Sequence, residues 1–166
     1  MAKLNPTEYT VADAIENGVG ELTQLRDELQ EWYDNLPENF QSGDKGDQLQ
    51  EAIGELDDAD GFDNSALVDA QDDDGEPAEP SCLTFIFNVS TKRRMSRADR
   101  CSEATAMLRQ AHDTVADWLQ KKTAAAGESE LDDATQENID GVNEALDELM
   151  NLIDRAEGVT FPGMYG

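Results

Sequence analysis

The sequence predicts a mostly α-helical protein: an antiparallel helical bundle of three long helices and one short helix, with a small β element around residues 82–89. Three observations lead to this fold class. Apolar residues recur in steps of three and four over long stretches, as on the buried face of an amphipathic helix. Helix-capping signals precede those stretches. Only residues 82–89 show the aromatic and β-branched alternation typical of a strand.

The first helix is expected to begin after Thr10, because Thr10 and Asp13 are spaced as a capping box, and to end at Pro37. Residues 37–46 are expected to form a loop, and a shorter helix should follow around Leu49–Leu56. The spacing of three and four predicts that one face of the first helix is buried: Val11, Ile15, Leu22, Leu25, Leu29, Trp32 and Leu36.

Two further helices are predicted in the carboxyl-terminal half. Ser96 is a cap for a helix that runs to about Lys122, and Ser129 is a cap for a last helix that ends at Gly158. The buried positions of these two helices are predicted as Cys101, Ala104, Leu108, Ala111, Val115 and Trp118, and as Leu131, Ile139, Val142, Leu146, Leu149 and Ile153.

The predicted strand needs a partner, because a lone strand leaves its backbone hydrogen-bonding groups open. Candidates within the chain are Ala66–Asp69 and Val159–Phe161, and a second copy or another protein could also supply the strand. Since leucine, isoleucine, valine and phenylalanine number only 32 of 166 residues, the core is lean. The lean core and the missing strand partner together predict a homo-oligomer.

The chain is interpreted as a single domain, 1–166. It comprises an amino-terminal helical hairpin (1–60), an acidic linker or loop (61–81), and a strand with a carboxyl-terminal helical hairpin (82–166).

Charge is the most informative property of the sequence. The chain has 38 acidic and 12 basic residues, a formal charge of −26. Residues 1–81 carry 23 acidic and 3 basic side chains (−20), residues 82–122 carry 4 and 8 (+4), and residues 123–166 carry 11 and 1 (−10). An anionic membrane surface would repel such a molecule, and two cysteines do not make a disulfide framework. We expect a cytoplasmic protein that does not bind membranes.

The acidic residues on the first and last helices form a candidate binding surface for a protein partner. Rigid helices hold carboxylates at fixed spacings, so such a surface can imitate the phosphates of DNA and occupy the groove of a nucleic-acid enzyme. A solvated acidic face, or adaptation to a salty cell, would produce the same composition. The candidate residues are Asp13, Glu16, Glu21, Asp27, Glu28, Glu31, Asp34, Asp133, Glu137, Asp140, Glu144, Asp147 and Glu148.

A basic turn before the second long helix is a candidate anion-binding site. Cations at the start of a helix oppose the helix dipole, and such a local conflict often marks a site. The alternative, which we favour, is that these side chains neutralise the protein's own carboxylates, such as Asp72–Asp74, and direct nucleic-acid binding is therefore not expected. The five residues are Lys92, Arg93, Arg94, Arg97 and Arg100.

Catalytic and metal-binding patterns are weak. Asp58–Asp63 resembles part of a calcium loop but does not have the EF-hand spacing. Carboxylates are too abundant here for a pair of them to indicate catalysis, and no phosphate loop or nucleophile motif occurs. We therefore expect a non-enzymatic protein with no metal and no cofactor.

Two segments, Glu31–Asn39 and Glu157–Tyr165, resemble parts of small acidic helical proteins of tailed bacteriophages. Those families have no assigned function, so the resemblance implies a phage origin and carries over no functional residue. With the charge pattern, it suggests an accessory protein that inhibits a nucleic-acid-handling protein in the host cytoplasm, for example in anti-defence. The alternatives are a virion structural or assembly protein, and nucleic-acid or phosphate binding through residues 92–100.

Overall fold

The computed structural model describes residues 4–63, 65–71, 74–76, 78–91, 95–126 and 133–161. In this part of the chain most residues are helical and two strands form a small antiparallel sheet, so the predicted fold class is confirmed. The elements are β1 (Leu4–Thr10), α1 (Val11–Asp34), α2 (Glu38–Gln41), α3 (Asp44–Gly61), α4 (Ser65–Val68), β2 (Thr84–Ser90), α5 (Arg97–Ala126) and α6 (Asp133–Glu157).

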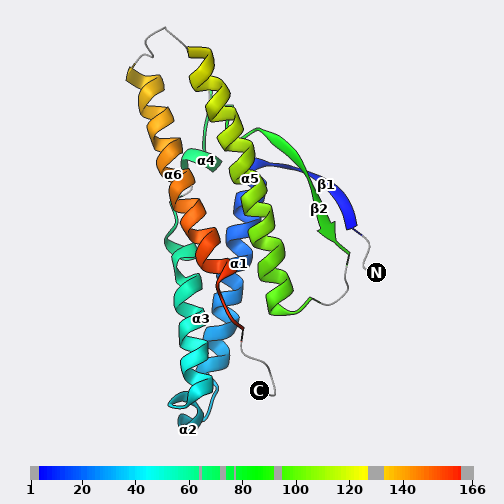
Figure 1. Cartoon of the computed structure of the whole chain (residues 1–166), viewed down its shortest axis with the longest axis vertical. Coiled ribbons are helices and arrows are strands. Elements are labelled where there is room, and N and C mark those ends of the chain that lie inside the picture. Colours follow the sequence, from blue (N-terminus) through cyan, green and yellow to red (C-terminus); the bar gives the residue numbers. More distant parts are fainter. Residues whose placement is uncertain are drawn as a thin grey trace.

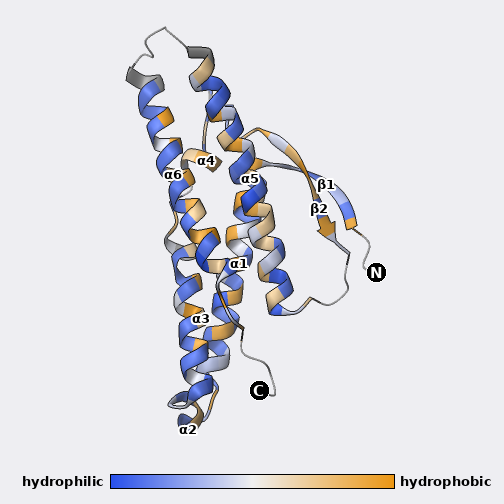
Figure 2. Ribbon diagram, viewed as in Figure 1, coloured by the Kyte–Doolittle hydropathy of each residue, from blue (hydrophilic) through white to orange (hydrophobic). Residues whose placement is uncertain are grey.

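Two helical hairpins, α1–α3 and α5–α6, are staggered along the long axis of the molecule (Figure 1). Within each hairpin the helices are antiparallel, and α5 also packs against α1, with the sheet on the outer side of α5. Hydrophobic residues lie on the helix faces that meet one another, while the outward faces are hydrophilic (Figure 2). The core therefore runs lengthwise between the helices.

Five of the seven predicted buried positions of the first helix are confirmed: Val11, Ile15, Leu22, Leu25 and Leu29 are completely buried. Trp32 and Leu36 are only partly buried, packed against the core, and Leu36 lies beyond the end of α1. The predicted cap also forms, because the Thr10 hydroxyl oxygen accepts a hydrogen bond of 3.1 Å from the Asp13 amide.

The same cap chemistry opens α5. The Ser96 hydroxyl oxygen accepts the Asp99 amide at 3.0 Å, as the sequence predicted. At the far end of the chain, the Gly158 amide closes α6 by donating to the carbonyl oxygens of Asp154 (3.2 Å) and Arg155 (3.1 Å). The predicted cap at Ser129 lies outside the described residues.

The predicted strand partners within the chain are wrong. β2 pairs with β1 in antiparallel register, Thr7 opposite Phe87, whereas Ala66–Val68 belongs to the short helix α4. The missing strand therefore comes from the chain's own beginning, and one of the two reasons for expecting self-association no longer applies.

Proline explains why β1 escaped the sequence analysis and why it can still be a strand. The Ile86 carbonyl accepts a hydrogen bond from the side chain of Gln110 (2.7 Å), and the Ser90 amide donates one to Glu103 (3.0 Å), so both backbone groups point away from β1. Pro6 stands opposite Asn88, which lies two residues from both Ile86 and Ser90, so the backbone groups of Asn88 also point away from β1. In this kind of pair the N–H that proline lacks would have pointed away from β2. Pro6 therefore costs no hydrogen bond of the sheet.

The predicted loop 37–46 and the predicted short helix also need correction. Residues Glu38–Gln41 form the single turn α2, and α3 spans 18 residues, Asp44–Gly61. Aspartates at the end of α3 would favour a loop, but arginines from neighbouring helices contact two of them: Arg26 pairs with Asp57 at 3.1 Å, and Arg155 pairs with Asp58. The apolar face also continues to this end of the helix, because Ala59, three residues after Leu56, is buried in the core.

The segment between α3 and β2 is anchored at both ends. Leu67 of α4 is completely buried. The buried Ser81 hydroxyl donates to the Leu67 carbonyl (2.8 Å) and accepts from the Ala70 amide (3.0 Å). The backbone carbonyl of Ser81 also accepts a hydrogen bond of 3.1 Å from the Ala12 amide, which connects this segment to the start of α1.

Candidate partner-binding surface

The exposed side of α6 carries a row of carboxylates spaced along the helix. We call five of them the α6 acidic face: Glu137, Asp140, Glu144, Asp147 and Glu148. All five are exposed, and no ion pair among the described residues engages any of them. The side chain of Asp133, a sixth predicted residue on this helix, lies outside the described part.

Helical geometry places the α6 acidic face opposite the core. At 100° per residue the five positions fall within a sector of about 100°, whereas Ile139, Val142 and Leu149 point to the other side and are buried. Along the axis the five charges span about 16 Å, or one charge per roughly 4 Å. A single DNA strand has one charge per about 3.4 Å of axis, so the linear charge densities are similar.

The predicted acidic residues of α1 divide into two groups. Glu21 and Glu28 are half-buried and bind arginines of α5, and Asp27 pairs with Arg26 at 2.8 Å. The remaining four, Asp13, Glu16, Glu31 and Asp34, are exposed and belong to no ion pair of the described residues. Part of the acidic surface predicted on α1 is therefore engaged in ion pairs within the protein.

Arg100 is the centre of this internal cluster. Its Nε lies 2.5 Å from Glu21, and its two terminal nitrogens lie 3.1 and 2.7 Å from the carboxylate oxygens of Glu28. The hydrogen bonds to Glu28 and to Glu21 raise the pKa of Arg100, against the opposing effect of partial burial. Every nitrogen of this guanidinium thus faces a carboxylate of α1.

Arg97 completes the contact between α5 and α1. Its Nε lies 3.7 Å from Glu28, and its guanidinium stacks 5.3 Å from the centre of the Trp32 ring. Arg97 and Arg100, two of the five residues of the basic turn, therefore neutralise the protein's own carboxylates Glu21 and Glu28, as the favoured interpretation expected of them. Lys92, Arg93 and Arg94, and also Asp72 and Asp73, lie outside the described residues.

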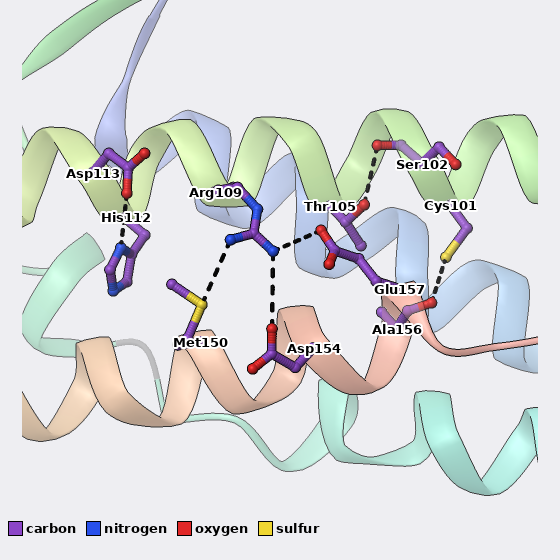
Figure 3. Close-up of polar contacts among 10 residues, drawn as sticks. All are labelled: Cys101, Ser102, Thr105, Arg109, His112, Asp113, Met150, Asp154, Ala156 and Glu157. Carbon is purple, nitrogen blue, oxygen red and sulfur yellow. Dashed lines mark hydrogen bonds and ion pairs between the residues drawn. The ribbon is translucent and has the colours of Figure 1, made fainter.

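Another arginine of α5, Arg109, contacts two carboxylates near the end of α6 (Figure 3). It lies 2.7 Å from Glu157 and 3.8 Å from Asp154, and the contact with Glu157 raises the pKa of Arg109. Beyond Glu148, the carboxylates of α6 are thus partly neutralised by α5. The unneutralised part of the helix is the five-residue face defined above.

The cysteine in this region, Cys101, has low reactivity. Cys101 is buried and its thiol donates to the Ala156 carbonyl at 3.4 Å (Figure 3). Burial, with a smaller contribution from the Glu157 charge, raises the pKa of Cys101 to about 11. A thiol protonated at neutral pH is a poor nucleophile, so Cys101 serves packing.

Known proteins give no further guide. Comparisons with protein-family models, with curated proteins and with solved structures find no match. Function is therefore inferred from the described surface itself.

The residues with described positions form neither a metal-binding cluster nor a membrane span. In that part of the chain, no three histidine, cysteine, aspartate or glutamate side chains form a group able to hold a metal ion. The described helices also include none with the length and apolarity needed to cross a bilayer.

Sequence reasoning did not identify Glu21 and Glu28 as arginine partners. A signal was present: Glu21 and Glu28 are seven residues apart, two turns on one face of α1, while Arg97 and Arg100 are three apart on one face of α5. Complementary charges at helical spacing on two helices indicate that the helices pack together. That signal was hidden by the many other carboxylates of α1.

Proposed function

We propose that this protein is a non-enzymatic accessory protein, of phage type, that binds and inhibits a host nucleic-acid-handling protein through its acidic surface, in the manner of a DNA mimic. The observation that carries the proposal is the α6 acidic face, five exposed carboxylates opposite the core with no arginine or lysine paired to them among the described residues. Cytoplasmic location in the host and action against host defence belong to the same proposal.

The physical reason is electrostatic. A groove that binds nucleic acid is lined with lysine and arginine, and its affinity arises largely from the release of counterions. A row of carboxylates at a density near that of one DNA strand gains the same counterion release. The packed α6 helix fixes the row in advance, so little conformational entropy is lost on binding.

The internal arginine clusters support α6 as the binding helix rather than α1. Arg26, Arg97 and Arg100 neutralise part of the α1 surface, whereas α6 keeps its charge along its exposed side as far as Glu148. The row of unneutralised carboxylates on one side of α6 is therefore the feature that supports a partner at this helix.

A pull-down from host lysate with two matched variants tests the proposal. Each variant removes four carboxylates by conversion to the amide, so the net charge is the same in both. The first changes α6: Asp140→Asn, Glu144→Gln, Asp147→Asn and Glu148→Gln. The second changes exposed carboxylates near α2 and α3 that form no described ion pair: Glu38→Gln, Asp44→Asn, Asp47→Asn and Glu51→Gln.

The wild-type protein and the second variant, changed near α2 and α3, should retain the same nucleic-acid-handling protein, which rising salt should release. The first variant, changed on α6, should not retain it. Equal retention by all three proteins, or equal loss from both variants, would show that only total charge matters. Recovery of no DNA- or RNA-handling protein by the wild type would count against the proposal altogether.

A further inference from the structure

A hollow of about 510 Å³ lies where the sheet meets α1 and α5. Its walls include Tyr9 from β1, Glu21 from α1, and Arg100, Glu103 and Met107 from α5. The α5 residues are spaced by three and four, so they share one face of that helix. A volume between about 300 and 1,000 Å³, with apolar walls and a few polar groups, is typical of small-ligand sites.

The charges of the described lining residues disfavour an anionic ligand. Arg100 is the only basic residue among the described lining residues, and its three nitrogens already face Glu21 and Glu28 at 2.5 to 3.1 Å. A phosphate or carboxylate would have to displace those contacts. The formal charge of the described lining residues, with Glu21 and Glu103 against Arg100, is −1, and the whole chain carries −26.

Glu103 is the group in the hollow best placed to receive a ligand. One of its oxygens, Oε2, accepts the Ser90 amide at 3.0 Å, which fixes the carboxylate against the end of β2. No ion pair of the described residues involves Glu103, so its charge is not neutralised by a described arginine or lysine. A positioned, half-buried carboxylate without a cation is a strong acceptor for a charged donor.

The apolar part of the lining suits an alkyl chain. Met95, on the segment before α5, and Met107 both line the hollow together with the Tyr9 ring. Methionine side chains adapt to the shape of an aliphatic stem, and an aromatic ring attracts a cation.

We propose that this hollow binds an alkylammonium or alkylguanidinium group, with the charged end at Glu103 and the aliphatic stem against Met95, Met107 and Tyr9. Two sources have this chemistry: the lysine or arginine side chain of a protein, and a free polyamine. The site does not use the α6 acidic face, so it can succeed or fail independently of the function proposed above.

The test uses the full chain labelled with ¹³C at the methionine methyl groups, titrated with agmatine and followed by NMR. The Met95 and Met107 methyl signals should shift saturably, while Met150, which lies against Arg109 between α5 and α6, should not. Pentan-1-ol, an alkyl chain without a cation, should produce no saturable shift. Comparing agmatine with N-acetyl-arginine amide distinguishes the sources. Tighter binding of agmatine indicates a free polyamine, and tighter binding of N-acetyl-arginine amide indicates a protein side chain.

Two charge-matched variants complete the test. Glu103→Gln keeps an oxygen for the Ser90 amide but removes the charge, and should weaken agmatine binding about tenfold or more. Glu144→Gln removes the same charge from α6 and should leave the affinity unchanged. Met95→Lys should abolish binding by placing the protein's own ammonium in the hollow, read at the Met107 methyl group.

Absence of any shift at Met95 and Met107 would overturn the proposal. Equal weakening by Glu103→Gln and Glu144→Gln would overturn it too, because the attraction would then be a property of the net charge rather than of this site.

Discussion

Replacing Gly18 by alanine should not stabilise the protein, although alanine favours helix, and the net effect should range from neutral to a loss of about 2 kcal/mol. A Cβ at position 18 would lie 2.6 Å from Cγ and Cδ2 of Leu108 on α5, and Leu108 is completely buried. Carbon atoms in good contact are about 3.5–4.0 Å apart, so α1 and α5 would have to separate by roughly 1 Å or Leu108 would have to leave its rotamer. Overpacking of this kind costs about 1–3 kcal/mol.

Gly20→Ala is the matched control, since position 20 lies in the same helix and nothing stands within 4 Å of the Cβ it would gain. Both variants gain about 1 kcal/mol of helix propensity. Gly20→Ala should therefore stabilise the protein by that amount. The difference between the two variants isolates the packing cost, and urea unfolding followed by circular dichroism should give about 1–3 kcal/mol.

A double-mutant cycle tests the cause. In a Leu108→Ala background the obstacle is gone, and Gly18→Ala should become stabilising. If Gly18→Ala stabilises the wild-type protein as much as Gly20→Ala does, the close approach of α1 and α5 at this position is wrong.

Three further predictions follow from single contacts and from the charge. Arg100→Met should lower the free energy of unfolding by about 1–3 kcal/mol, because it leaves half-buried carboxylates without their partner; an unchanged urea midpoint would contradict the cluster. At pH 8 a thiol reagent should modify the exposed Cys82 quickly and Cys101 only on unfolding, and rapid labelling of both would refute this. The pKa of Cys101 lies above its ordinary value of 9.0, so the protonated thiol stabilises the folded state, and this contribution should be lost as pH rises from 9 toward 11. Raising KCl from 0.1 to 1 M should raise the melting temperature, since shortening the Debye length from about 10 to 3 Å weakens self-repulsion, and a fall would mean that attraction between charges dominates.

The elements with strong local signals could be predicted from the sequence. Thr10 and Ser96 are caps in the structure as predicted, because a hydroxyl three residues before an amide satisfies that amide without help from the rest of the chain. The buried faces of the long helices also follow from spacing alone, as Leu108 and Leu149 illustrate. These features depend on neighbours in sequence.

Features that depend on distant residues were missed. β1 contains Pro6 and polar residues, so its sequence gives no strand pattern, and only its pairing with β2 makes it a strand. At the end of α3, Arg26 and Arg155 from other helices contact the aspartates, and Ala59 is buried against the core. The partners of Arg100 were missed for the same reason, since charge composition does not say which carboxylates will face which arginines.

The central claim is that the α6 acidic face replaces nucleic acid on a partner protein, and competition measures this directly. A fluorescent duplex DNA bound to the captured partner is titrated with this protein while its anisotropy is recorded. The wild-type protein should displace the duplex, less effectively as salt rises, and the variant with four α6 carboxylates neutralised should displace it poorly. Formation of a ternary complex with undiminished anisotropy, or equal displacement by the α6 variant, would contradict the claim.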